Sequence, residues 1–162
     1  KDKGDRAVAH VHADLADRGF VVLFPATEHA AFDLVAYDHS SFSRIQVKFR
    51  SQTRGVITVE LRSGWSDRSG VHHTPLDRKE VDVVAIYCPD SGECYYLDPA
   101  QYRNSVTLRL SPPQNNQQSG VLMASGTRGY PSVGAEAFPG HMAINNQLKT
   151  LLKEGATIYS AP

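Results

Sequence analysis

The chain opens with apolar residues at helical spacing and then changes to short apolar runs. The residues that share one helical stripe are Ala7, Val8, Val11, Leu15 and Ala16. Gly19 follows at a position where helices commonly end. The pattern therefore predicts a helix over residues 5–18.

Short apolar runs separated by turn residues follow, and this arrangement favours strands. The predicted strands are residues 20–25, 32–38, 44–50, 55–62, 81–88 and 93–98, with a final strand at 106–110. Pro25 closes the first run, which we expect to be buried, whereas residues 32–38 and 44–50 are expected to form a hairpin. The stretch from Ser63 to Pro75 is rich in Gly and Ser, has no period, and predicts a loop.

One helix followed by strands of mixed direction predicts an α/β (α+β) domain over residues 1–130. A chain of 162 residues, of which 41% are hydrophobic, can bury one sizeable core. Two prolines and two glycines in the next stretch suggest a linker at 131–142. Residues 143–162 are expected to form an amphipathic helix and tail, with an apolar stripe of Ile144, Leu148, Leu151 and Leu152.

Formal charge is balanced over the chain but uneven along it. Lys and Arg number 17, as do Asp and Glu, which argues against a broad, non-specific polyanion binder. Between His39 and Leu76 the sequence has six basic residues and two acidic ones, which gives a local excess of four positive charges. This excess fits either a patch that meets phosphates or an ordinary solvated face.

The same sequence has no apolar run long enough to span a membrane and no recognisable leader. We therefore expect a cytoplasmic protein. Cys88 and Cys94 fit no zinc spacing and are expected to be reduced thiols. His10 and His12 point to different sides of the predicted helix and do not form a metal pair.

Polar side chains interrupt two of the apolar strands. Asp33 lies in the first strand of the predicted hairpin, and Gln46 and Lys48 lie on one face of the second. Burying a carboxylate with nothing to pair is costly. The three residues therefore form either a structural ion pair or a site that something else completes.

An aspartate in a strand, a turn and then "QVK" resembles the core motif of the PD-(D/E)XK nucleases. The blocks "KGDRA", "FDLVAYD", "RIQVKFR", "VDVVAIYCPDSGECYYL" and "LRLSPPQNNQ" together are similar to the group I intron-encoded homing endonucleases of that superfamily, whose variant motif is Q-X-K. The resemblance spans roughly Lys3 to Gln117. It implies a restriction-endonuclease-like core, a mixed β-sheet flanked by helices.

The resemblance also implies a catalytic trio and a metal ion. Asp33, Gln46 and the backbone carbonyl of Val47 would bind Mg²⁺ through oxygen atoms, and Mn²⁺ would be an alternative ion. Lys48 would orient or deprotonate the attacking water and offset charge on the phosphate. The implied reaction is hydrolysis of a DNA phosphodiester bond.

One position departs from the family pattern. Val8 stands where the first helix commonly supplies another acid, and Asp5 or Glu28 are the expected substitutes. Because Gln46 is also neutral, Asp33 would bring the only formal negative charge to the metal. We therefore expect weak Mg²⁺ affinity, a preference for Mn²⁺, or a core that binds DNA without cutting it.

Basic residues around the predicted hairpin and loop are candidates for DNA contacts. They are Arg44, Arg50, Arg54, Arg62 and Arg68. Trp65 would either stack on DNA or pack, and the amides of "SPPQNNQQ" would read adenine or cap a turn.

These features together predict a metal-dependent, sequence-specific DNA endonuclease acting on double-stranded DNA. A single small domain covers little DNA, so we expect a homo-oligomer, either a dimer or the tetramer of the resembled family. Two alternatives stay open. One is another nuclease role on the same core, in restriction, repair or junction resolution, and the other is a catalytically silent DNA-binding module.

Overall fold

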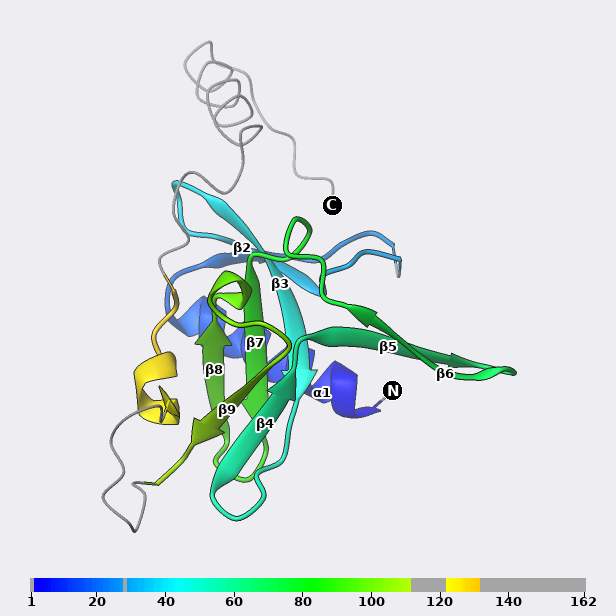
Figure 1. The fold of residues 1–162 in the computed structure, drawn as a ribbon. Coiled ribbons are helices and arrows are strands. Elements are labelled where there is room, and N and C mark those ends of the chain that lie inside the picture. Colours follow the sequence, from blue (N-terminus) through cyan, green and yellow to red (C-terminus); the bar gives the residue numbers. More distant parts are fainter. Residues whose placement is uncertain (1, 28, 112–121, 132–162) are drawn as a thin grey trace.

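The computed structural model describes residues 2–27, 29–111 and 122–131, and the fold is drawn in Figure 1. Its largest sheet has the strand order β1(Val21–Leu23), β2(Leu34–Tyr37), β3(Phe42–Phe49), β7(Val83–Cys88) and β8(Glu93–Leu97). A three-stranded sheet has the order β10(Leu122–Met123), β9(Ser105–Arg109) and β4(Val56–Glu60). The remaining elements are α1(Asp2–Asp17), the hairpin β5(Arg62–Asp67) and β6(Gly70–Pro75), and the 3₁₀ turns η1(Pro99–Gln101) and η2(Ala124–Thr127). This mixed α+β architecture confirms the predicted fold class.

Helix α1 covers one face of the five-stranded sheet (Figure 1). Its buried side chains are Ala7, Val11 and Leu15, all on the predicted stripe. The helix begins three residues earlier than predicted, and Asp2 and Asp5 in its first turn suit the positive end of the helix dipole. At the other end Gly19 has a φ of 85°, and Phe20 N–H donates to the Leu15 carbonyl. This left-handed glycine cap ends the helix as expected.

The three-stranded sheet packs on the opposite face, so the large sheet is covered on both sides. Strand β7 is buried at every position, as its continuous apolar sequence indicates. Ile86 and Cys88 face the core shared with β4 and β9, whereas Ala85 and Tyr87 face α1. Cys94 also faces the α1 side, which separates the two free thiols across the sheet.

Strand β3 changes its partners halfway along. Its first half, Phe42–Ile45, pairs antiparallel with β2, whereas Ile45–Phe49 pairs parallel with β7. In the part of the chain that the structure describes, no strand therefore pairs with residues 46–49 on the β2 side. We call this unpaired edge of β3 the opening.

Three predictions about individual strands are wrong. Strand β1 was expected to be buried, but it is an outer strand whose Val21 and Leu23 are exposed. The stretch Ser63–Pro75 was expected to be a loop, but cross-strand pairing makes it most of the hairpin β5–β6, which projects from the body (Figure 1). The strand at 106–110 is not the last, because β10 pairs with β9 in parallel.

The other predicted strands and the hairpin β2–β3 are confirmed. Residues 132–162 lie outside the described part, so the linker at 131–142, the helix at 143–162 and the boundary at 130 stay predictions. None of the described helices has both the length and the apolar character needed to cross a membrane.

Candidate active site

Asp33 lies immediately before β2, beside the opening in the sheet. Its backbone N–H donates to the Ile45 carbonyl at 2.8 Å, which extends the β2–β3 pairing by one step. Its Oδ2 accepts a hydrogen bond of 2.7 Å from Val47 N–H. The carboxylate thus stands where a neighbouring strand would otherwise meet β3.

Electrostatic effects on Asp33 oppose one another. Desolvation by the surrounding protein raises the pKa of its carboxyl, although the residue keeps an exposed side. The Val47 hydrogen bond and the charge of Lys48 lower the pKa but do not cancel the desolvation. A nearby cation would therefore be favourable here, because it would stabilise the ionised carboxylate.

Gln46 follows Ile45 on β3 and is buried, with 8% of its surface exposed. Its Nε2 donates to the Ala31 carbonyl at 3.4 Å, in the segment that leads to Asp33. This hydrogen bond holds the Gln46 amide against the segment that leads to Asp33. Its remaining polar atom is an oxygen, which is the donor type that a hard divalent cation takes.

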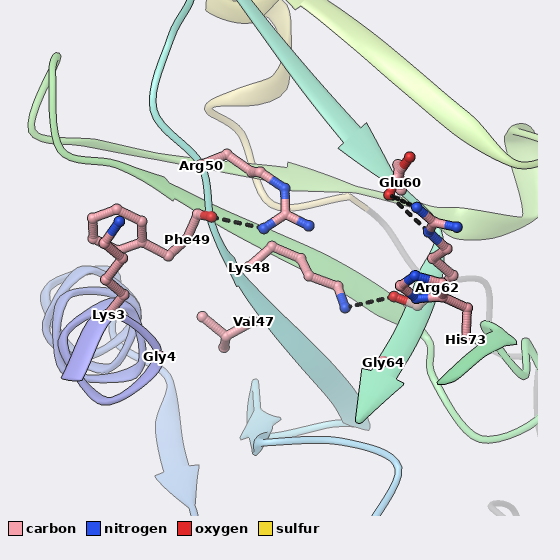
Figure 2. Close-up of a pocket in the computed structure, with 10 residues that line it drawn as sticks. All are labelled: Lys3, Gly4, Val47, Lys48, Phe49, Arg50, Glu60, Arg62, Gly64 and His73. Carbon is pink, nitrogen blue, oxygen red and sulfur yellow. Dashed lines mark hydrogen bonds and ion pairs between the residues drawn. The ribbon is translucent and has the colours of Figure 1, made fainter. Parts of the chain in front are cut away.

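Lys48 is half-buried on the same face of β3 as Gln46. Its Nζ donates to the Arg62 carbonyl at 3.0 Å, so the side chain bridges β3 and β5 (Figure 2). Desolvation, helped by the charge of Arg50 and opposed by that of Asp33, lowers the pKa of Lys48 to about 8. Near neutral pH its ammonium can therefore release a proton far more readily than an exposed lysine can.

A pocket of about 420 Å³ lies beside this stretch of β3. It is lined by Lys3 and Gly4 of α1, by Val47, Lys48, Phe49 and Arg50, and by Glu60, Arg62, Gly64 and His73 from β4, β5 and β6 (Figure 2). Val47 and Lys48 belong to its wall, and Val47 also contacts Asp33. Asp33 and Gln46 are not among its lining residues.

The first helix brings a cation to this pocket. Val8 packs partly buried against the core between α1 and the sheet, which suits an apolar side chain. Asp5 is exposed and does not line the pocket, whereas Lys3 does. Glu28 lies outside the described residues, so its role as a substitute acid stays a prediction.

The five candidate arginines are in different surroundings. Arg50 and Arg62 line the pocket. Arg44 does not: its guanidinium binds Asp82 and the Lys79 carbonyl, which ties β3 to the segment before β7. Arg54 is exposed in a turn, and Arg68 is exposed at the tip of the hairpin β5–β6. Of the predicted set, only two therefore lie near Lys48.

Sequence reasoning missed three residues of the pocket wall. They are Lys3, Glu60 and His73, none of which the sequence assigned to a site. Glu60 had a readable signal, since it is two residues before Arg62 and so lies on the same side of an extended chain. His73 had none, because its place depends on the unexpected β5–β6 pairing.

The oxygen atoms of Asp33, Gln46 and Val47 are of the type that binds a hard divalent cation, and such a site would have modest affinity. Among the described residues, no three His, Cys, Asp or Glu side chains gather into a metal-binding group. A metal ion would therefore need the Gln46 amide and the Val47 carbonyl beside the Asp33 carboxylate. All three are oxygen donors, as Mg²⁺ and Mn²⁺ require.

A family model of the PD-(D/E)XK endonucleases matches residues 1–128. The chain therefore belongs to the PD-(D/E)XK endonuclease family, whose members generally use divalent metal ions to cut DNA. No curated protein sequence matches the chain.

Two solved structures are similar to this chain, and the first of them supports the fold. The structure of the bacterial homing endonuclease I-Ssp6803I is similar with a TM-score of 0.58 and 19% sequence identity, covering 96% of this chain and 97% of that one. A Holliday junction resolvase, Hjc of Archaeoglobus fulgidus, also matches, with a TM-score of 0.43, 14% identity and coverage of 66% and 84%.

Proposed function

We propose that the protein is a metal-dependent, sequence-specific endonuclease that hydrolyses phosphodiester bonds in double-stranded DNA. The observation that carries this proposal is the proximity of Asp33 and Lys48 beside β3: the Asp33 carboxylate accepts from the N–H of Val47, the residue before Lys48, and each of the two charges shifts the pKa of the other. The cationic lining of the pocket beside Lys48 also supports it. Similarity to a homing endonuclease supports recognition of a specific site.

In this proposal each residue has a separate task. Asp33, Gln46 and the Val47 carbonyl hold a divalent cation, which would supply positive charge to the phosphate and lower the pKa of bound water. Lys48 faces the attacking water, takes its proton in the neutral form, and stabilises the developing phosphate charge in the cationic form. Arg50 and Arg62 contact the DNA backbone at the pocket, and Arg54 and Arg68 contact more distant phosphates.

The proposed metal site has a low negative charge, and this has a consequence for metal choice. Among the described residues, no group of three His, Cys, Asp or Glu side chains gathers around Asp33. Half-saturation of activity is therefore expected at a higher concentration of Mg²⁺ than of Mn²⁺, because Mn²⁺ binds oxygen and nitrogen donors more tightly. Titration of nicking with each ion would measure this difference.

The deciding test is nicking of supercoiled plasmid and of pooled random duplexes in Mg²⁺, Mn²⁺ or EDTA. We expect cleavage by the wild type with either metal and a loss of at least about a hundredfold in Lys48→Ala and Asp33→Asn. Lys79→Ala is the matched control, because Lys79 is exposed and outside the pocket. Equal loss in the control would contradict the assignment.

The same assay separates the two alternatives. Metal-dependent cleavage of branched junctions in preference to linear duplexes would favour a resolvase-like role. Intact duplex binding with no cleavage in any metal would favour a silent DNA-binding module. Val8 in place of an acid and the low negative charge of the proposed metal site support this alternative.

We also propose that the protein acts as a homo-oligomer, a dimer or a tetramer. Its described core is one small domain, and a long DNA site needs several such domains. Light scattering in solution should give a multiple of the chain mass of 17.8 kDa. A strictly monomeric mass in the presence of duplex would contradict this part of the proposal.

A further inference from the structure

The pocket beside Lys48 is strongly cationic. Lys3, Lys48, Arg50 and Arg62 contribute four cations to its wall, against the single carboxylate of Glu60. These side chains come from α1, β3, the residue after β3 and β5, so the tertiary fold, and not one charged segment, concentrates them (Figure 2).

In the Glu60–Arg62 ion pair, the Glu60 carboxylate occupies the guanidinium donors that a bound phosphate would use. Arg62 Nε and Nη2 both approach Glu60 Oε2, at 2.7 and 2.6 Å. A phosphate oxygen accepts the same pair of guanidinium donors. The two side chains are 42% and 50% exposed, so their ion pair contributes little to folding and a new partner for Arg62 would cost little.

The remaining contacts leave room for an anion among these cations. Lys48 uses its Nζ on the Arg62 carbonyl, and Arg50 uses Nη1 on the Phe49 carbonyl. Lys3 lies over the Phe49 ring with its Nζ 5.8 Å from the centroid, which leaves its ammonium able to reach a ligand. His73 closes the wall from β6.

We propose that this pocket binds a backbone phosphate of duplex DNA next to the scissile one, and that Glu60 is an internal counter-ion of Arg62 which this phosphate displaces. The inference rests on the proposed DNA endonuclease function and deepens it. Val47 lines the pocket and also donates to the Asp33 carboxylate, so the two phosphates would lie close together on either side of this short stretch of β3. Because Glu60 competes with the phosphate for Arg62, it weakens phosphate binding. A duplex that also contacts the other residues of the site can overcome this competition.

The test measures binding of a labelled duplex in EDTA by fluorescence anisotropy over a series of KCl concentrations. Arg62→Gln and Lys3→Gln should each lower the slope of log K against log salt by about 1 and weaken binding about three- to tenfold at moderate salt. Glu60→Gln should strengthen binding by a similar factor. Metal-free conditions exclude cleavage from the readout.

Matched controls exist for both kinds of substitution. Glu93 forms an exposed pair with Arg128 at 3.4 Å, outside the pocket, so Glu93→Gln makes the same chemical change elsewhere. Lys79→Gln serves the same purpose for Lys3→Gln. Both controls should keep the wild-type slope, and thermal unfolding of each variant checks that it is folded.

The double variant Glu60→Gln/Arg62→Gln tests the exchange of partners itself. If Glu60 acts by occupying Arg62, removing Glu60 should no longer strengthen binding once Arg62 is gone. An undiminished effect of Glu60→Gln in that background would overturn the exchange. Wild-type slopes in Arg62→Gln and Lys3→Gln would overturn the phosphate pocket.

These outcomes are distinct from failure of the proposed function. A wild type that nicks DNA while the pocket variants keep its salt slope refutes only the inference. A wild type that neither binds nor nicks duplex DNA refutes both.

Discussion

At the scale of single residues, the candidate site depends on groups held in unfavourable surroundings. Lys48 is partly desolvated next to Arg50, and Asp33 is partly desolvated with one backbone hydrogen bond. Such arrangements weaken a folded protein unless a ligand completes them. These two residues are therefore expected to lower the stability of the folded protein.

Lys48 should show this cost directly. Its pKa of about 8 lies below the 10.5 of an unperturbed lysine, so the folded protein disfavours the bound proton. Stability should therefore rise with pH between about 8 and 10.5, where the unfolded chain holds more protons. At pH 7, where both states are protonated, Lys48→Met should raise the free energy of unfolding by about 1–2 kcal/mol.

Urea unfolding in EDTA at pH 7 and again near pH 9.5 would measure the Lys48→Met difference. The gain should shrink at the higher pH, because the wild type then loses the unfavourable proton. Lys79→Met, at an exposed site, should change little at either pH. A Lys48→Met variant less stable than wild type at pH 7 would show that the Arg62 hydrogen bond outweighs desolvation.

At the scale of elements, the division of β3 between two partners creates the site. Asp33 ends the coverage by β2, and β7 supports the rest of β3 from the other side. The hairpin β5–β6 then adds Arg62 and His73 to the wall. The opening is therefore a consequence of strand length and register.

The turn that leads into β4 supports another prediction. Arg54 and Gly55 have φ angles of 52° and 75°, and Thr53 and Val56 exchange two hydrogen bonds around them. This is a two-residue hairpin turn that favours Asn-Gly. Arg54→Asn should therefore raise the free energy of unfolding by about 0.5–1 kcal/mol, measured by urea unfolding.

Gly55→Ala gives the opposite control, since its added Cβ would be strained at positive φ and would lie 3.2 Å from Ser111 Oγ. It should destabilise the protein by about 1 kcal/mol or more. Arg54→Asn also reports on DNA, because weaker binding in a more stable variant would identify Arg54 as a phosphate contact. A loss of stability in Arg54→Asn would contradict the turn assignment.

At the scale of the whole molecule, one sheet supports two cores. Leu15 on α1 packs on one face, and Ile57 on β4 packs on the other, with β7 buried between them. Because β7 belongs to both cores, they should unfold together in one transition.

Leu15→Ala and Ile57→Ala should each lower the free energy of unfolding by about 2–5 kcal/mol, since each leaves a cavity at a fully buried position. Both should shift a single cooperative transition followed by circular dichroism. Thr58→Ala, on the exposed side of β4, should have a much smaller effect. Two separate transitions in either variant would show that the cores are independent.

The sequence by itself determined most of the elements and singled out the residues of the candidate site. Periodicity defined α1 and the β2–β3 hairpin, because local spacing decides which side of an element is apolar. Asp33, Gln46 and Lys48 were conspicuous because charge is costly within apolar strands. Whether they catalyse a reaction is a question for the nicking assay.

Only the tertiary structure decided where β3 exchanges partners, which strand is outermost, and what surrounds Lys48. The pairing of β5 with β6 depends on backbone hydrogen bonds, and backbone hydrogen bonds leave little trace in a stretch rich in Gly and Ser. Lys3, Glu60 and His73 meet because α1, β4 and β6 are packed around one opening. Contacts between residues so far apart in the chain are set by packing, and no local pattern encodes them.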